Sequence, residues 1–273
     1  MNSVSDRITI PKLLARKKSG GKITMLTAYD ATMARLLDRA GIDALLVGDS
    51  LGTVILGCDT TIPVTLDAMV HHSSAVAKGA QRALVIADMP FLTYQTSTTE
   101  ALRNAARLLQ EGHASAVKME GGTAIAETVN RLVEAGIPVM GHIGLTPQYV
   151  HRLGGFRAVG RTAKEAGQMT EDARSLQEAG AFAIVLESTP ASLAAQITAE
   201  LTIPTIGIGA GVGCDGQVLV SYDAFGLFDT FAPKFVKRYA KLGDMMVEAT
   251  RQYIREVQDG EFPGPQHSIQ AHE

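Results

Sequence analysis

Short apolar runs recur along the chain at intervals that suit strands separated by helices. Eight runs, each about six residues long, are dominated by Val, Ile, Leu, Ala and Met. They cover residues 23–29, 44–50, 83–89, 116–121, 139–144, 183–188, 205–210 and 217–223. Continuous apolar runs of this length are typical of strands that are buried on both faces of a parallel sheet.

The segments between these runs carry helix signals. "STTE" at 97–100 and "TAKE" at 162–165 have the spacing of a capping box, in which a hydroxyl and a glutamate bond each other's free backbone amides. Thr189 followed by Pro190 predicts an N-cap and a first helical residue. Glycines that favour a helix end are Gly41, Gly112, Gly136 and Gly180. Strand and helix therefore alternate almost throughout.

Eight parallel strands that each return through a helix favour closure into a (β/α)8 TIM barrel, with an open doubly wound sheet as the second choice. We expect one domain over residues 1–273, with the barrel at about 22–240. The basic segment 10–21 predicts a helix that closes the bottom of the barrel, and 241–258 predicts an extra C-terminal helix. Residues 259–273, rich in Pro, Gly, Gln and His, predict a loose tail.

Composition and charge narrow the function classes. The chain of 273 residues is 46% hydrophobic, enough for a sizeable core, and its net charge of −3 gives no basic field for nucleic acid. Cys58 and Cys214 lack CxxC spacing, so neither a disulfide framework nor a zinc site is indicated. With no signal-peptide pattern and no long apolar window, we expect a cytoplasmic protein that does not span a membrane.

Polar residues gather where the predicted strands end. These residues are Asp49, Ser50, Asp88, Lys118, Glu120, His142, Glu187 and Ser188. One charged residue in such a position is ordinarily the solvated start of a loop, but the carboxyl ends of barrel strands converge on one mouth. Four carboxylates there would repel one another and raise each other's pKa, so a positive group is expected among them.

Two positive groups fit, and they are not exclusive. Alternation places Lys118 and Glu120 on one face of their strand, so Lys118 can neutralise a carboxylate. A buried ion pair adds little net stability, however, and a divalent cation explains the acidic set better. Hard oxygen ligands without cysteine favour Mg²⁺ over Zn²⁺, and Mg²⁺ leaves coordination positions for a bidentate ligand such as a 2-oxo acid.

Other features leave alternatives open. The glycine-rich stretch 207–217 resembles a phosphate-binding loop, but a plain tight turn is equally compatible with it. His71 and His72 are neighbours in a predicted helix and do not share a face, which argues against a metal site of two histidines. We expect at least one of them in the core or at a helix cap.

Ten motifs, in order between about residues 8 and 268, resemble the ketopantoate hydroxymethyltransferase (3-methyl-2-oxobutanoate hydroxymethyltransferase) family. They are "LLVGDSLG", "DTTIPVT", "IADMPF", "VKMEGG", "GHIGLTPQ", "IVLES", "PTIGIGAG", "DGQVLV", "DAFG" and "PKFVKRY". The resemblance implies a (β/α)8 barrel that transfers a one-carbon unit from 5,10-methylenetetrahydrofolate to 3-methyl-2-oxobutanoate, giving 2-dehydropantoate for pantothenate biosynthesis. It also implies Mg²⁺, a homodecamer and, in bacteria, the cytoplasm.

The resemblance also implies roles for the strand-end residues. By the family pattern, the metal ligands are Asp49 and Asp88, and Glu120 is the third carboxylate of the metal site. By the same pattern, the residues that contact the oxo acid are Asp49, Ser50, Asp88 and Lys118. The catalytic base that it implies is Glu187. His142 is expected to line the same site. Mg²⁺ would then stabilise the enolate that forms when the C3 proton leaves.

Rival functions remain to be compared. A Mg²⁺-dependent 2-oxo acid lyase or mutase of the phosphoenolpyruvate/pyruvate type would use a similar barrel, and only the family motifs argue against it. A phosphate-dependent enzyme would rest on the glycine-rich stretch, which lacks a basic residue. A non-catalytic metal-binding protein would have no need of Glu187 as a base.

Overall fold

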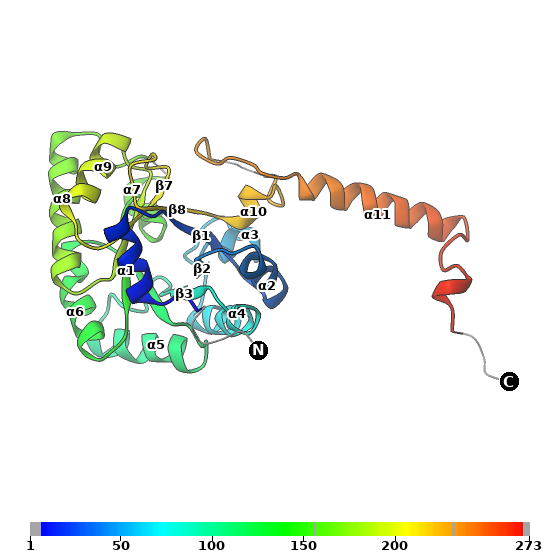
Figure 1. Cartoon of the computed structure of the whole chain (residues 1–273), viewed down its shortest axis with the longest axis horizontal. Coiled ribbons are helices and arrows are strands. Elements are labelled where there is room, and N and C mark those ends of the chain that lie inside the picture. Colours follow the sequence, from blue (N-terminus) through cyan, green and yellow to red (C-terminus); the bar gives the residue numbers. More distant parts are fainter. Residues whose placement is uncertain (1–6, 156, 231–232, 270–273) are drawn as a thin grey trace. The chain divides into compact units, whose positions relative to one another are not determined.

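Eight parallel strands close into a barrel in the computed structural model, which describes residues 7–155, 157–230 and 233–269 (Figure 1). The strands are β1 (Ile23–Thr27), β2 (Ala44–Val47), β3 (Leu84–Asp88), β4 (Ala116–Glu120), β5 (Val139–Gly144), β6 (Ala183–Glu187), β7 (Thr205–Ile208) and β8 (Gly216–Leu219). Each strand pairs with the next along the chain, and β8 closes the circle by pairing with β1. The predicted (β/α)8 barrel is confirmed, and the open sheet is excluded.

Helices surround the strands on the outside (Figure 1). The longer ones are α2 (Ala31–Arg39), α4 (Leu66–Gly79), α5 (Thr98–Gln110), α6 (Ala126–Glu134), α8 (Ala163–Glu178) and α9 (Ala191–Glu200). Short helical turns interrupt the connections: α3 (Leu51–Val54), η2 (Thr123–Ile125), η3 (Pro147–Tyr149) and α7 (Val150–Leu153). The two long connections after β2 and β5 are thus partly helical.

The predicted helix starts are only partly correct. Thr162 and Glu165 form the complete capping box of α8. At α5 the Ser97 side chain accepts from the Glu100 amide, but the Glu100 carboxylate bonds the Thr96 hydroxyl instead of returning to the cap. The prediction for Thr189 was wrong, because its hydroxyl donates to the Glu187 carbonyl and the N-cap of α9 is the following proline.

The barrel interior follows one alternation of side chains. Inward-facing apolar residues from all eight strands form a single buried cluster that includes Leu84 and Ile86 of β3, Ala116 of β4 and Ala183 of β6. Ile8 belongs to the same cluster, and Leu13 of α1 (Ile10–Ser19) joins it, so the predicted N-terminal helix does close the barrel at its bottom. The same alternation, continued along each strand, determines which polar residues face the mouth.

No helix separates β7 from β8. The intervening glycine-rich stretch packs against α9 instead: a Cβ on Gly211 would lie 2.5 Å from the Cβ of Ala191, and one on Gly213 would lie 2.7 Å from that of Ala195. These glycines permit a close approach of backbone to helix. Because the stretch is followed by a strand rather than a helix N-terminus, the phosphate-loop interpretation loses its structural basis.

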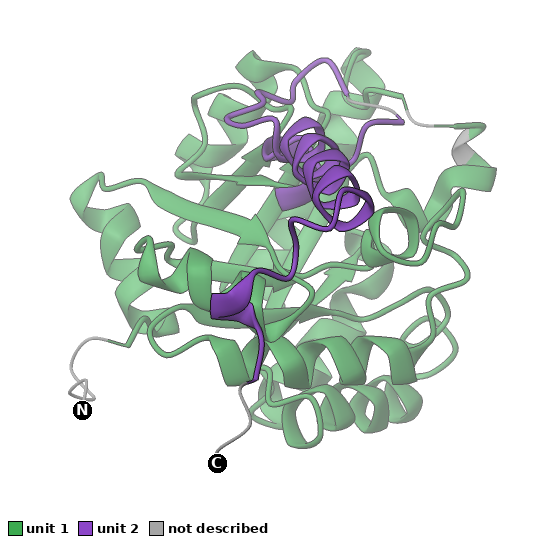
Figure 2. Cartoon of the chain, turned by 90° about the vertical axis from the view of Figure 1, so that its right-hand side faces the viewer, with its two compact units in different colours: residues 1–220 green, residues 221–273 purple. Residues whose placement is uncertain are grey.

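The chain divides into two compact units, residues 1–220 and 221–273, which Figure 2 colours separately. The second unit contains α10 (Ser221–Ala224), α11 (Leu242–Gln258) and η4 (Pro265–His267). The predicted C-terminal helix is therefore present as α11, whereas the single domain over 1–273 stays a prediction. None of the helices within the described ranges has both the length and the apolar character that a bilayer crossing requires.

Candidate active site

The predicted polar residues meet inside the mouth of the barrel. Every second residue of β3 to β6 faces the barrel interior. The apolar ones form the core, and nearer the carboxyl ends of the same strands this alternation brings inward Asp88, Lys118, Glu120, His142 and Glu187. All but Glu187 are almost completely buried, and the Glu187 side chain is 16% exposed. The sequence-derived set therefore forms one cluster at the carboxyl ends of β3 to β6, where barrel enzymes carry their chemistry.

Asp49 joins this cluster from the residues that follow β2. Its backbone amide donates to Oδ2 of Asp88 at 3.0 Å, and its own Oδ2 accepts from Nε2 of Gln148 at 2.9 Å. Ser50 follows Asp49 in the chain, and its hydroxyl lies 2.9 Å from the Tyr29 hydroxyl. Two aspartates from neighbouring strands are thus tied together through a backbone amide.

Lys118 supplies the positive charge that was predicted among the carboxylates at the barrel mouth. Its Nζ lies 2.8 Å from Oδ1 of Asp88, 3.9 Å from Oε1 of Glu120 and 3.2 Å from Nδ1 of His142. The lysine side chain is only 5% exposed, so these contacts replace water around the ammonium group. A buried ammonium group that lost its carboxylates would carry a large desolvation penalty.

His142 lies between two glutamates in the mouth. Nδ1 lies 3.5 Å from Oε1 of Glu120, and Nε2 lies 3.3 Å from Oε2 of Glu187. The backbone beside Glu187 is strained and tightly packed: Ser188 has a positive φ of 48°, and a Cβ on Gly144 would lie 2.3 Å from the Glu187 carbonyl oxygen. Strained backbone beside a polar side chain is a common feature of functional sites.

The pKa shifts divide the buried carboxyl groups into two kinds: those of Asp49 and Asp88 are raised, and that of Glu120 is lowered. Burial, with the charges of Asp88 and Glu120, raises the pKa of Asp49 well above its usual range. Burial also raises the pKa of Asp88, although Lys118 opposes it. Burial alone would raise the pKa of Glu120 too, but interactions with His142 and Lys118 lower it.

The pKa values of the two basic groups, Lys118 and His142, are both raised. Burial disfavours the charged lysine, but the surrounding carboxylates, Asp88 first, raise the pKa of Lys118. Burial and Lys118 disfavour protonation of the imidazole, yet Glu120 and Glu187 raise the pKa of His142 to about 9. Lys118 and His142 are therefore both charged at neutral pH, Lys118 beside Asp88 and His142 between Glu120 and Glu187.

A divalent cation fits beside Asp49 and Asp88, because each of them has a carboxylate oxygen without a hydrogen bond to the described residues. Oδ1 of Asp49 makes no hydrogen bond within the described part of the chain, and the buried Oδ1 of Asp88 has the Lys118 ammonium nearby but no partner in hydrogen-bond geometry. No group of three His, Cys, Asp or Glu side chains in the described ranges is arranged to hold a metal. Two carboxylates suffice for Mg²⁺, which usually keeps several waters.

Sequence reasoning missed three neutral residues of this site. Tyr29 contacts Ser50, Tyr94 bonds the Gln148 side chain and the backbone amide of Glu120, and Gln148 donates to the Asp49 carboxylate. Gln148 lies within the motif "GHIGLTPQ", but an uncharged residue in a loop carries no sign of burial. The expectation that His71 or His72 lies in the core or at a helix cap was wrong: both lie within α4, His71 is exposed, and His72 is half-buried with its Nδ1 2.6 Å from the Tyr29 carbonyl oxygen.

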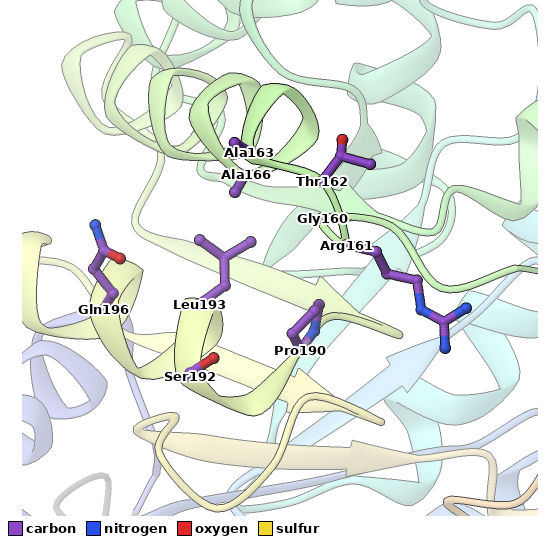
Figure 3. Close-up of a pocket in the computed structure, with 9 residues that line it drawn as sticks. All are labelled: Gly160, Arg161, Thr162, Ala163, Ala166, Pro190, Ser192, Leu193 and Gln196. Atoms are coloured by element: carbon purple, nitrogen blue, oxygen red, sulfur yellow. The ribbon is translucent and has the colours of Figure 1, made fainter.

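A pocket of about 340 Å³ lies elsewhere, between the first turns of α8 and α9 (Figure 3). Its lining residues are Gly160, Arg161, Thr162, Ala163, Ala166, Pro190, Ser192, Leu193 and Gln196. It contains none of the residues predicted to be catalytic. The buried charge cluster, rather than this pocket, is therefore the candidate active site.

Solved structures resemble the barrel. A phosphonopyruvate hydrolase in complex with oxalate and Mg²⁺ has a TM-score of 0.62 at 13% identity, covering 94% of this chain and 92% of its own. A 2,3-dimethylmalate lyase of the PEP mutase/isocitrate lyase superfamily has a TM-score of 0.60 at 17% identity, with the same coverage. At such identities the likeness shows the fold alone.

Sequence comparisons identify the family as well as the fold. The 3-methyl-2-oxobutanoate hydroxymethyltransferase of Carboxydothermus hydrogenoformans is 56% identical over 97% of this chain and 96% of its own length. The Moorella thermoacetica enzyme of the same name is 57% identical over 96% and 98%, respectively. Residues 7–265 also match the model of the ketopantoate hydroxymethyltransferase family. The chain therefore is an enzyme that belongs to the ketopantoate hydroxymethyltransferase family.

Proposed function

We propose that this enzyme transfers a hydroxymethyl group from 5,10-methylenetetrahydrofolate to 3-methyl-2-oxobutanoate, giving 2-dehydropantoate for pantothenate and coenzyme A biosynthesis. The observation that carries the proposal is the identity of 56–57%, over nearly the whole chain, to enzymes named for this activity. The cluster of carboxylates, lysine and histidine at the barrel mouth supports it chemically, because the reaction removes a carbon-bound proton beside a carbonyl.

Asp49 and Asp88 would hold Mg²⁺, and Glu120 completes the acidic set of the metal site. When bound, Mg²⁺ supplies the positive charge that stabilises developing negative charge on the carboxylate and keto oxygens of the oxo acid. Lys118 adds a second positive charge beside Asp88, from which its Nζ is 2.8 Å away. Ser50, held by Tyr29, donates to the substrate from the rim of the same site.

Glu187 serves as the base in this proposal. Its carboxylate takes the proton from C3 of the oxo acid, and the electron pair left on C3 forms the new bond to the folate-derived methylene carbon. Both bonds between that carbon and the folate nitrogens break: water supplies the hydroxyl oxygen and one proton, the proton taken by Glu187 goes to the second nitrogen, and tetrahydrofolate leaves. His142, whose Nε2 is 3.3 Å from Oε2 of Glu187, orients the carboxylate and lines the substrate site.

Proton exchange tests the base without folate. We expect wild-type enzyme with Mg²⁺ to exchange the C3 proton of 3-methyl-2-oxobutanoate for deuterium, followed by NMR. Glu187→Gln should slow exchange by about 10²–10⁴-fold while Mg²⁺ and the oxo acid still bind. Glu178→Gln, at the exposed end of α8, is the matched control and should exchange normally. Wild-type exchange in Glu187→Gln would show that another group is the base.

Folate dependence separates this function from that of a 2-oxo acid lyase or mutase. The transferase forms 2-dehydropantoate only when 5,10-methylenetetrahydrofolate is present and Mg²⁺ has not been removed by a chelator. A lyase or mutase would instead consume an oxo acid without any folate. A turnover assay with folate and chelator varied independently tells the two apart.

We also propose that the enzyme is a cytoplasmic homodecamer. Helix α11 supports assembly, because none of its residues is buried although it carries many large apolar side chains. Those that are more than 40% exposed are Met245, Met246, Val247, Tyr253, Ile254 and Val257. An apolar surface of this kind marks a protein contact. Sedimentation equilibrium should give about ten times the chain mass of 28.9 kDa.

A further inference from the structure

Gln148 has the most completely bonded neutral side chain in the acidic cluster described above. It lies in η3, in the connection between β5 and α8, and only 2% of it is exposed. Its Nε2 donates to Oδ2 of Asp49 and to the carbonyl oxygen of Met89, both at 2.9 Å. Both donors of the amide are therefore used, and one of them acts on a carboxylate of the proposed metal site.

The acceptor end of the same amide is also occupied. Oε1 of Gln148 accepts from the Tyr94 hydroxyl at 2.8 Å and from Nε2 of Gln95 at 3.3 Å. A reversed amide would place an oxygen against the Asp49 carboxylate and the Met89 carbonyl, which can only accept. The surroundings thus permit one orientation of the amide, with its NH₂ group on Asp49.

The backbone of Gln148 holds a second carboxylate. Its amide N–H donates to Oε2 of Glu120 at 3.0 Å, and the Tyr94 hydroxyl that bonds Oε1 also accepts from the backbone amide of Glu120 at 3.1 Å. One residue of the β5–α8 connection is therefore bonded to Asp49, which follows β2, and to Glu120 of β4. A shift of this connection would move both carboxylates.

We propose that Gln148 is a positioning residue for the metal site: by holding Oδ2 of Asp49 it leaves Oδ1 free for the divalent cation. The inference rests on the proposed function, because it assumes that Asp49 binds Mg²⁺. Partners that orient metal ligands in this way contribute strongly to affinity, and their loss typically weakens metal binding 10–100-fold. Gln148 itself touches neither the metal nor the reacting atoms.

Binding of Mn²⁺ without any substrate tests the proposal, with the free ion followed by electron paramagnetic resonance. Gln148→Met keeps the side-chain length but cannot donate, so we expect its Mn²⁺ dissociation constant to rise by about 10–100-fold. Gln177→Met is the matched control. Its Oε1 accepts from the amides of Thr202 and Ile203 at a distance from the mouth, so its loss should lower stability without changing Mn²⁺ affinity.

Gln148→Glu provides a second variant, should Gln148→Met not fold. It keeps the shape and the acceptor for Tyr94 but places an oxygen against Asp49, so Mn²⁺ binding should again weaken. A dissociation constant within twofold of wild type in either folded variant, or tighter binding in Gln148→Glu, overturns the proposal. So does an equal loss in Gln177→Met, which would make the effect one of general stability. A wild-type protein that binds no Mn²⁺ overturns the proposed metal site as well.

Discussion

Replacing Lys118 by methionine tests the electrostatic account of the barrel mouth most directly. The substitution keeps the unbranched side chain and removes the ammonium group. In the wild type that group lies 2.8 Å from Asp88 and 3.9 Å from Glu120, in a position that is only 5% exposed. The variant would leave these carboxylates buried with His142 as the only cation that the described residues place against them.

The expected cost follows from these distances. At an effective dielectric constant of about 20, unit charges 2.8 Å apart attract each other by about 6 kcal/mol, and charges 3.9 Å apart by about 4 kcal/mol. Desolvation of the ammonium group cancels much of this gain, and removal of one partner from a buried ion pair typically costs 3–5 kcal/mol. At about 2–4 °C per kcal/mol, the apparent Tm of Lys118→Met should fall by roughly 6–20 °C.

The pH dependence distinguishes lost charge from lost packing. Lys118 lowers the pKa of both Asp88 and Glu120, so both values rise when it is removed, and the folded variant binds more protons than the folded wild type. Its stability relative to the wild type therefore increases as the pH falls, and the penalty should be smaller at pH 5 than at pH 8. Thermal unfolding at both pH values measures this difference.

A matched control and a second substitution complete the experiment. Lys78→Met on the exposed surface of α4 should change stability by less than about 0.5 kcal/mol. Asp88→Asn added to Lys118→Met should recover part of the loss, with a coupling energy of about 0.5–3 kcal/mol. An unchanged Tm in Lys118→Met, or a penalty equal at pH 5 and pH 8, would refute the reasoning.

Three further predictions concern the same site. Mg²⁺ at 100 times its dissociation constant should stabilise the protein by about 2.7 kcal/mol in thermal unfolding, and Asp49→Asn should abolish this shift. Gly144→Ala should lower stability by about 1–3 kcal/mol in urea, because φ is 94° there and the new Cβ would meet the Glu187 carbonyl oxygen; a wild-type midpoint would disprove the clash. The charge on His142, whose pKa is raised from 6.5 to about 9, stabilises the fold fully below pH 6.5 and is lost as the pH rises through 9. The stability gap between wild type and His142→Gln should therefore narrow from pH 6 to pH 10, and a constant gap would contradict the assigned charge.

The architecture could be predicted because burial on both faces makes barrel strands continuous apolar runs. The run at 116–121 became β4, and its alternation correctly placed Lys118 and Glu120 on one face. The eighth run was less exact: β8 ends at Leu219, and Ser221 already begins α10. An apolar run alone cannot separate a strand from the buried first turn of the helix that follows it.

Charged site residues could be found in the sequence, but their neutral partners could not. Asp88 and Lys118 are conspicuous because a charge at the end of an apolar strand is costly unless it is paired. Gln148 and Tyr94 lie in connections, where polar residues are ordinary, and they become buried only because the chain folds back over the mouth. Their hydrogen bonds depend on that three-dimensional return, which has no periodic pattern in the sequence.

The three acidic residues of the proposed metal site are therefore not equivalent. Glu120 is neutralised by the protein itself, since His142 and Lys118 lower its pKa and the Gln148 amide bonds its other oxygen. Asp49 keeps an oxygen without a partner among the described residues. Burial and the charges of Asp88 and Glu120 raise its pKa, which means that they destabilise its ionised form. A divalent cation stabilises an ionised carboxylate most where no cation of the protein already does so. Asp49, with Asp88 beside it, should thus gain most from the metal, and Glu120 should act chiefly by holding Lys118 and His142 in place around it.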